Sequence, residues 1–262
     1  MADRGYALVT GASKGIGAEM AGQLAADHWS LVLVARGKGE LDTLASSLSA
    51  KHGVKALVLA SDLSQPNAAS DLWTRVNALG VKVDVLINNA GFGLLGPFPK
   101  TSWQRELEII QVNITALTEL TKLALPPMLE RKQGWILNVA STAGFVPGPF
   151  MSVYYASKVY VLSFSEALAS ELAGSGVTVS VLCPGPTRTQ FADTAESTKS
   201  KLFKGGGVME AAPVARIGLA GLFSGKVVVV PGFQNKLMIQ SLRVAPRAMV
   251  RRITRNMQQT EP

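Results

Sequence analysis

Residues 6–17 read Tyr-Ala-Leu-Val-Thr-Gly-Ala-Ser-Lys-Gly-Ile-Gly, a short apolar strand that runs directly into three closely spaced glycines. Residues 16–27 then show helical spacing. Glycine permits a positive φ, a close approach of the backbone to a pyrophosphate, and close packing of a helix on a strand. The N-terminus of the helix presents free N–H groups to an anion. The spacing Gly-x-x-x-Gly-x-Gly between strand and helix therefore predicts a phosphate-binding turn; the alternative is a tight turn without a ligand.

Six further apolar stretches resemble this first strand, Tyr6–Thr10. They are β-branched or Leu-rich and almost continuously hydrophobic, as strands covered on both faces are: Leu31–Ala35, Ala56–Ala60, Val83–Ile87, Trp135–Val139, Val177–Leu182 and Val227–Val230. Helical spacing fills the intervals at Gly39–His52, Ala68–Leu79, Ser102–Glu130 and Val153–Ala173. This alternation predicts right-handed βαβ units and an α/β fold, a single-domain, Rossmann-type, doubly wound parallel sheet of about seven strands with helices on both faces.

Composition is typical of one large folded domain. The chain has 262 residues, of which 47% are hydrophobic and 17% charged, so disorder is not expected. Cys183 is the single cysteine and cannot form an intramolecular disulfide. The start of the chain does not resemble a signal peptide, and no apolar run is long enough to span a bilayer. We therefore expect a cytoplasmic protein, with peripheral membrane contact as a further option.

The formal net charge is +8, and much of the excess lies near the C-terminus. If Pro246 opens a helix, its apolar residues cluster on one face and its arginines on the other, which predicts a basic amphipathic helix. The apolar residues are Met249, Val250, Ile253 and Met257, and the arginines are Arg247, Arg251, Arg252 and Arg255. This helix would lie on an anionic membrane, cover a site, form a subunit interface or simply pack on its own domain. Nucleic-acid binding is not expected, because interleaved aromatic residues and a reading helix are lacking.

Cations occupy the positions where a nucleotide ribose is expected. In an open parallel sheet, ligands bind beyond the carboxyl ends of the strands. Arg36 follows the second strand, where a carboxylate would bind both ribose hydroxyls; arginine instead suits a 2′-phosphate, and Lys14 lies nearby in the glycine turn. The sequence predicts NADP(H) in preference to NAD(H); the alternative is two solvated cations. Asp62, followed by Leu63, is expected to meet the adenine, or else to be a turn or N-cap residue.

Four further motifs follow later strands in a fixed order. They are Asn88-Asn89-Ala90-Gly91, Ser141, Tyr154-Tyr155-Ala156-Ser157-Lys158 and Pro184-Gly185. Together with the glycine turn, over roughly residues 5–232, this set resembles the short-chain dehydrogenase/reductase family. The resemblance implies an oxidoreductase that transfers hydride reversibly between a nicotinamide and a ketone or alcohol. It also implies a homodimer or homotetramer formed through the helices that carry Asn113 and Tyr154.

Tyr154 and Lys158 stand one helical turn apart and project from one face. A phenol has a reference pKa near 10, and a nearby ammonium would lower the pKa of Tyr154 toward the operating pH. Tyr154 is then the expected general acid/base. The resemblance implies that Lys158 also holds the nicotinamide ribose, that Ser141 hydrogen-bonds the substrate oxygen, and that Asn113 holds a water for proton relay. Each residue also has a purely structural alternative, and a non-catalytic NADP-binding scaffold or sensor is the alternative for the whole chain.

Asn88 is expected to stabilise the central strands, and Tyr155 is assigned to packing because its spacing to Lys158 is one residue short. The resemblance places the nicotinamide carboxamide against the segment after the sixth strand. No metal site is predicted. The predicted cofactor-binding residues are Gly11, Ser13, Lys14, Gly15, Ile16, Gly17, Arg36, Asp62, Leu63, Asn89, Ala90, Gly91, Tyr154, Lys158, Pro184, Gly185, Thr187 and Thr189.

The substrate side is apolar and almost uncharged. The loop Phe92–Pro99 and the segment Ala143–Phe150 are expected to form its walls, which predicts an apolar substrate that is lipid-like, such as a 3-oxoacyl or steroid-like ketone. Residues 188–212, with their glycine run, are expected to form a substrate lid. We therefore divide the chain into a catalytic domain at 1–232 and a basic C-terminal extension of that domain at 233–262.

Overall fold

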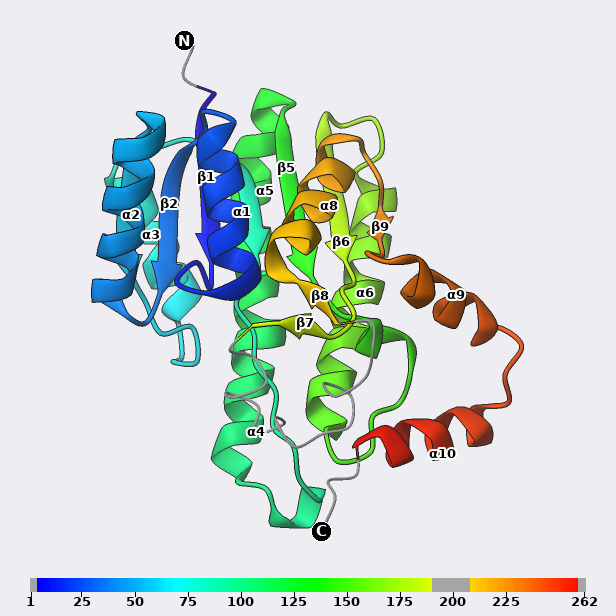
Figure 1. Ribbon diagram of the computed structural model, residues 1–262. Coiled ribbons are helices and arrows are strands. Elements are labelled where there is room, and N and C mark those ends of the chain that lie inside the picture. Colours follow the sequence, from blue (N-terminus) through cyan, green and yellow to red (C-terminus); the bar gives the residue numbers. More distant parts are fainter. Residues whose placement is uncertain (1–3, 190–207, 259–262) are drawn as a thin grey trace.

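A parallel sheet of seven strands, in the order β3-β2-β1-β4-β5-β6-β9, forms the centre of the computed structural model, which describes residues 4–189 and 208–258 (Figure 1). The strands are β1 Tyr6–Thr10, β2 Ser30–Ala35, β3 Ala56–Ala60, β4 Val83–Asn88, β5 Gly134–Val139, β6 Val177–Leu182 and β9 Val228–Val229. The predicted fold class is confirmed, and the strand bounds agree to within one residue. The order reverses between β1 and β4, which places the expected ligand crevice at their carboxyl ends.

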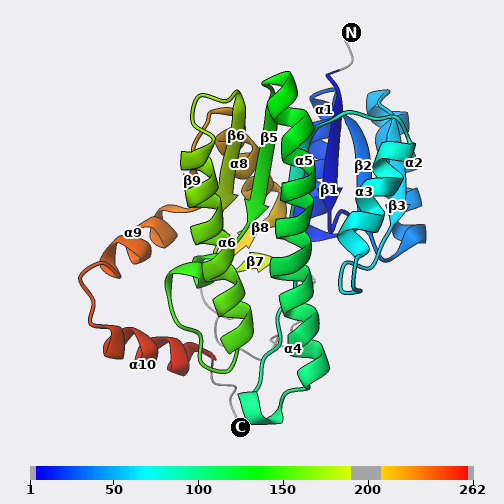
Figure 2. The same cartoon turned by 180° about the vertical axis from the view of Figure 1, so that it is seen from behind.

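Helices cover both faces of the sheet, as Figures 1 and 2 show from opposite sides. One face carries α1 Gly15–Ala26, α2 Lys38–His52 and α8 Ala211–Phe223; the other carries α3 Ala68–Ala78, α5 Leu117–Arg131 and α6 Ser152–Glu171. Successive strand residues serve opposite cores, since Leu33 packs in one while Val32 and Val34 pack in the other. Burial on both sides explains why the strands are continuously hydrophobic.

The predicted helix Ser102–Glu130 is interrupted. It consists of α4 Trp103–Ile110, a π-helical turn over Gln111–Ala116, and α5. A π turn holds one more residue than an α turn and is often found at functional sites. Here it contains Asn113, whose amide is thereby set against the loop after β4, accepting from the N–H of Phe92 (3.2 Å) and donating to its carbonyl (3.0 Å). Sequence periodicity does not reveal such an insertion.

Two buried amides join the central strands. Asn88 on β4 donates from Nδ2 to Oδ1 of Asn138 on β5 over 2.9 Å, and also to Oγ1 of Thr121 over 3.0 Å. Asn138 in turn donates to Oγ of Ser165 on α6 over 2.9 Å. The expectation that Asn88 stabilises the central strands is therefore confirmed.

Several elements lie beyond the predicted set. β7 Thr187–Arg188 pairs in parallel with β8 Met209–Glu210, and α9 Phe233–Ser241 follows the sheet. Two-residue strands are too short to show periodicity. The predicted helix after Pro246 is present as α10 Arg247–Gln258. Most of the expected lid, namely residues 190–207, lies outside the described residues.

Within residues 4–189 and 208–258, no helix is both long and apolar enough to cross a membrane. In the same part of the chain, no three His, Cys, Asp or Glu side chains group as metal ligands would.

Candidate active site

The glycine turn connects β1 to α1 at the carboxyl edge of the sheet. Gly11 and Gly15 have φ values of +63° and +57°, which side chains other than glycine rarely adopt. A Cβ on Gly17 would lie 2.3 Å from the carbonyl oxygen of Gly11 and 2.4 Å from Nδ2 of Asn89. All three glycines are thus required by the backbone, and α1 begins at Gly15 with its N-terminus at the turn. This arrangement fits a pyrophosphate.

Asn89 fastens the turn to the neighbouring strand. Its Nδ2 donates to the carbonyl oxygens of Thr10 (2.9 Å) and Gly11 (3.1 Å). In return, Oγ1 of Thr10 accepts from the N–H groups of Asn89 and Ala90, each over 3.0 Å. Thr10 was missed by the sequence reasoning, although a hydroxyl at the end of a buried strand is a usable signal.

An acidic residue lies among the cations at the place where a nucleotide ribose is expected, which we call the ribose end. Lys14 makes an ion pair with Glu40, with Nζ and Oε1 2.7 Å apart and both side chains about half exposed. Arg36 is exposed, and it lines one cavity of about 570 Å³ together with Lys14 and Glu40. Glu40 was not predicted, because its place on α2 brings it near Lys14 only in three dimensions. Its carboxylate offsets the charge of one of the two cations expected to bind a 2′-phosphate.

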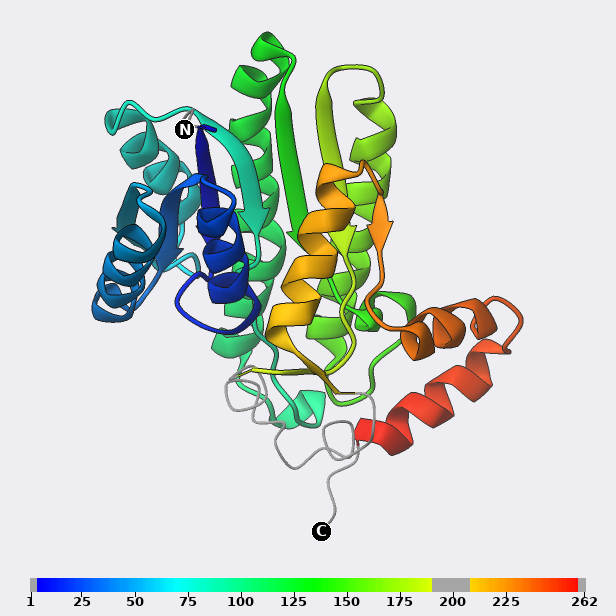
Figure 3. The same ribbon diagram turned by 45° about the horizontal axis from the view of Figure 1, so that its top comes forward.

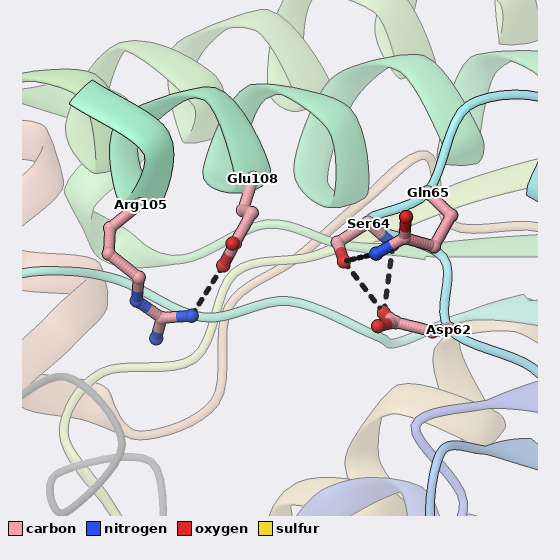
Figure 4. A network of polar contacts seen from close by, with 5 residues as sticks. All are labelled: Asp62, Ser64, Gln65, Arg105 and Glu108. Carbon is pink, nitrogen blue, oxygen red and sulfur yellow. Dashed lines mark hydrogen bonds and ion pairs between the residues drawn. The ribbon is translucent and has the colours of Figure 1, made fainter. Parts of the chain in front are cut away.

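Asp62 forms a turn with the residues that follow it (Figure 4). Its Oδ1 accepts from the N–H (3.1 Å) and Oγ (2.8 Å) of Ser64. Partial burial acts to raise the pKa of Asp62, but the hydrogen bonds from Ser64 and Gln65, helped by the charge of Arg36, bring the pKa below its ordinary value. Asp62 is therefore a turn residue, which is one of the alternatives expected from the sequence. Asp62 also faces the cavity, so the expected adenine contact stays a prediction.

Ser141, Tyr154 and Lys158 meet at one wall of the cavity. The hydroxyls of Ser141 and Tyr154 are hydrogen-bonded to each other. Ser141 begins a short 3-10 turn, accepting from the N–H of Ala143 (3.1 Å). Lys158 Nζ donates to the carbonyl oxygen of Val139 (2.8 Å) and lies 5.7 Å from the centroid of the Tyr154 ring.

The expected lowering of the Tyr154 pKa is wrong for this geometry. Burial raises the pKa of Tyr154 above its ordinary value, the hydrogen bond with Ser141 opposes this only in part, and neighbouring Tyr155 adds to it. Lys158 turns its ammonium to Val139, and burial lowers its own pKa to about 8 against a smaller opposing effect of Cys183. Tyr154 is therefore a protonated phenol across the neutral range.

Asn113 lies behind this wall, 1% exposed, and donates from Nδ2 to Oγ of Ser157 over 3.0 Å. A Cβ on Gly91 would come within 3.1 Å of Oδ1 of Asn113 and 3.3 Å of Nζ of Lys158. Gly91 thus lets the loop after β4 approach both side chains. The water relay implied for Asn113 stays a prediction.

One cavity of about 570 Å³ collects the predicted site, with Gly17 and Asn113 just behind its wall. It extends from the ribose end at Arg36 to the wall at Tyr154. Of the two loops expected as substrate walls, Phe92 and Ala143 contribute. Further lining residues that were not predicted include Gly37, Glu40, Ser61, Ser64, Glu108, Val112, Met151 and Gln258. Glu108 reaches the cavity from α4, where it is paired with Arg105 (Figure 4).

The tail of the chain also reaches this cavity. Tyr155 packs edge-on against the Tyr154 ring, with centroids 5.8 Å apart, as its assignment to packing predicts. Its hydroxyl is bonded to Nε2 of Gln258 over 2.5 Å. Gln258 stands 103 residues further along the chain and ends α10. Sequence gives no signal for this contact.

Comparison with known proteins agrees with this geometry. A sequence model described as short chain dehydrogenase matches residues 5–200. The chain belongs to the short-chain dehydrogenase/reductase family. Members of this family are oxidoreductases that act on alcohol and carbonyl groups, and the match extends over the glycine turn, the Tyr154–Lys158 pair and the strands between them.

Similar short-chain dehydrogenases/reductases include a very-long-chain 3-oxoacyl-CoA reductase from Phaeosphaeria nodorum, 38% identical over 231 residues, which cover 79% of this chain and 66% of the relative. The chain spans about half to two thirds of the length of the curated relatives it matches. A solved Sphingobium yanoikuyae enzyme in complex with NADPH is 33% identical with a TM-score of 0.83, covering 94% of each chain. A bulky-bulky ketone specific alcohol dehydrogenase from Comamonas testosteroni is 30% identical with a TM-score of 0.79, covering 93% of each.

Proposed function

We propose that the chain catalyses the NADPH-dependent reduction of an apolar ketone to an alcohol, and the reverse oxidation, with Tyr154 as the general acid/base. The observation that carries this proposal is the meeting of Ser141, Tyr154 and Lys158 at one wall of a cavity whose other end holds the glycine turn. A nucleotide bound across that length brings its reactive end to the hydroxyl pair.

Ser141, Tyr154 and Lys158 would each have a separate role in the reduction. NADPH, when bound, supplies the hydride for the carbonyl carbon. The hydroxyls of Ser141 and Tyr154 hold the carbonyl oxygen, and Tyr154 gives its proton to that oxygen as negative charge develops on it. The raised pKa of Tyr154 keeps the phenol protonated at neutral pH, but it also makes the phenol a weak acid, so the phenolate needs stabilisation when the proton leaves. Lys158, whose ammonium lies 5.7 Å from the centroid of the Tyr154 ring, would leave the carbonyl of Val139 and stabilise the phenolate as it forms on Tyr154.

NADP(H) is the cofactor that the ribose end favours. The glycine turn and the N-terminus of α1 would hold the pyrophosphate, and Arg36 the 2′-phosphate. Lys14 would join Arg36 once it exchanges Glu40 for the phosphate. The Sphingobium yanoikuyae relative, which was solved with NADPH, supports this choice.

The proposed substrate is lipid-like. Apolar side chains line the cavity around Tyr154, among them Phe92, Val112 and Met151. The names of two relatives point the same way, one for very-long-chain 3-oxoacyl-CoA and one for bulky ketones. A 3-oxoacyl thioester or a polycyclic ketone fits such walls better than a small carboxylic acid does.

The test follows NADPH consumption with three substrate sets: 3-oxoacyl thioesters of increasing chain length, steroid ketones, and a small polar keto acid as the control. We expect kcat/KM to rise with apolar area and to be lowest for the keto acid. Binding of NADPH without turnover of any carbonyl would overturn this assignment in favour of a scaffold or sensor.

We also propose a homodimer or homotetramer formed through α4, α5 and α6. Leu107 on α4, together with Val159 and Tyr160 on α6, is apolar and 37–44% exposed. These helices carry the large apolar groups that a subunit interface covers. Sedimentation velocity of the full chain measures the assembly, and a monomer at micromolar concentration would contradict it.

A further inference from the structure

α10 turns polar residues toward the protein and apolar residues outward. Val250, Thr254 and Gln258 follow one another at intervals of four and are 9%, 6% and 4% exposed. On the adjoining stripe, Met249 is 57% exposed and Ile253 is 47% exposed. The predicted apolar face is therefore divided, since only Val250 of its members is buried. A helix that packs only on its own domain normally buries its apolar stripe.

Specific contacts fix this orientation. At its end, Gln258 is bonded to the hydroxyl of Tyr155 inside the cavity wall. The guanidinium of Arg255 lies 5.7 Å from the centroid of the Phe150 ring, and Thr254 can be buried because its hydroxyl donates within the helix to the carbonyl of Val250 (2.8 Å). The outward stripe of Met249 and Ile253 is thus a consequence of a well-contacted helix.

The segment before α10 is similar. We name residues 233–258, which comprise α9, α10 and their connection, the C-terminal arm; Figures 1 and 3 show it extending from the body of the fold. In its first half Phe233 is 78% exposed, Leu237 61% and Val244 87%. Several exposed apolar side chains on one segment are typical of a surface that binds a protein or a membrane.

The charge of the arm favours a lipid surface over a second copy of the chain, two of the alternatives that the sequence leaves open for this helix. Residues 211–258 contain no acidic residue. The cations of the arm are Lys236, Arg243, Arg247, Arg251, Arg252 and Arg255. A second copy pairing through the same face would set these like charges against each other. An anionic lipid surface accepts both the cations and the apolar stripe.

We propose that the C-terminal arm docks on an anionic lipid surface, with Met249 and Ile253 entering the acyl boundary and the arginines of α10 meeting lipid phosphates. The start of α4 lies at the same end of the molecule as α10 (Figure 2). Trp103 is the first residue of α4 and is 66% exposed, and Phe98, which lies against the same small pocket as Trp103, is 57% exposed. Tryptophan is common at membrane interfaces. Two separate segments therefore present large apolar groups at this end.

Docking in this way sets the substrate cavity beside the lipid surface, because Gln258 belongs to both the arm and the cavity wall. An apolar ketone dissolved in the bilayer then reaches the cavity with little passage through water. This consequence rests on the proposed function; the docking itself does not.

The test is flotation of the full chain, without cofactor or substrate, with vesicles of phosphatidylcholine alone or mixed with phosphatidylglycerol. We expect wild type to bind the mixed vesicles about tenfold better than the neutral ones. Met249→Ser/Ile253→Ser should lose about tenfold in binding to mixed vesicles, because both side chains insert. Arg251→Gln/Arg252→Gln should lose most of the preference for the anionic lipid.

Two matched controls remove equal numbers of groups elsewhere. Leu79→Ser/Val227→Ser takes away two exposed apolar residues next to the amino ends of strands, and Lys51→Gln/Lys55→Gln takes away two exposed cations. Both should bind as wild type does. Equal flotation of wild type and Met249→Ser/Ile253→Ser, or binding to neither vesicle, would overturn the proposal. So would a dimer in sedimentation velocity that Met249→Ser/Ile253→Ser dissociates. Turnover of a small water-soluble ketone, which these variants should retain, reports separately on the proposed function.

Discussion

Lys158 donates a hydrogen bond from Nζ to the backbone carbonyl of Val139 across 2.8 Å, at a position only 5% exposed. The ammonium is therefore bonded to a backbone carbonyl in a buried part of the wall, and burial brings the pKa of Lys158 down to about 8. The same burial raises the pKa of Tyr154, because it penalises the charged phenolate. Tyr154 thus stays protonated at the pH, about 8, at which Lys158 begins to lose its charge.

The pH dependence of reduction follows from that pair. Below pH 8 Lys158 is charged, and above it the charged fraction falls about tenfold per pH unit. Because Tyr154 stays protonated throughout, we expect kcat/KM for ketone reduction at saturating NADPH to be level near neutrality and to decline above about pH 8. Initial rates from about pH 6 to about pH 10 measure this.

Lys158→Arg is the matched variant, because a guanidinium keeps its charge over this range. Its rate should be lower, since the fork does not fit a site built for an ammonium, but its decline above pH 8 should disappear. If kcat/KM declined at the same pH in wild type and in Lys158→Arg, the group that titrates would not be Lys158.

Removal of the Tyr154 hydroxyl tests the acid directly. Tyr154→Phe should reduce turnover by about 10³-fold, within the range of general acid catalysis, while NADPH binding stays near wild type. Tyr160→Phe is the control: it removes from the same helix a hydroxyl that lies outside the cavity and is bonded to Thr118, keeps the ring on the proposed subunit interface, and should keep its activity. Stopped-assay turnover and a fluorescence titration with NADPH give the two readings; turnover of Tyr154→Phe within a few-fold of wild type would refute the assigned role.

Local sequence predicted those parts of the site that short stretches build. The glycine turn, the Tyr154–Lys158 pair and the succession of strands and helices along the chain depend on neighbours in the chain, so motif and periodicity reveal them. Glu40 and Gln258 come to the cavity from helices whose placement depends on packing, and no local pattern marks them. The π turn at Asn113 is hidden for a related reason, because one inserted residue barely alters helical spacing.

Glu40 provides a test of cofactor choice. Its carboxylate pairs with Lys14 where a 2′-phosphate is expected, so it competes with that phosphate for the cation. Glu40→Gln should therefore tighten NADPH binding several-fold and leave NADH binding almost unchanged, because NADH carries no 2′-phosphate. Arg36→Asp should act in the opposite direction and remove the preference for NADPH. Fluorescence titration of both cofactors measures the ratio, and a preference for NADH in wild type would reverse our interpretation of this end of the cavity.

Substitutions at two glycines of α1 test the effect of close backbone contact separately from the effect of helix propensity. At Gly17 a Cβ would overlap the carbonyl of Gly11 at 2.3 Å, whereas at Gly22 the nearest described atom is Cδ2 of Leu48 at 3.9 Å, an ordinary contact. Gly17→Ala must therefore push the turn off α1, and we expect it to lose about 2 kcal/mol of unfolding free energy together with most of its affinity for NADPH. Gly22→Ala should gain about 0.5 kcal/mol, since alanine favours the helix, and should bind NADPH as wild type does. Urea unfolding and NADPH titration of both variants test this pair. Normal NADPH binding by Gly17→Ala would show that the close approach of turn and helix is not needed to hold the cofactor.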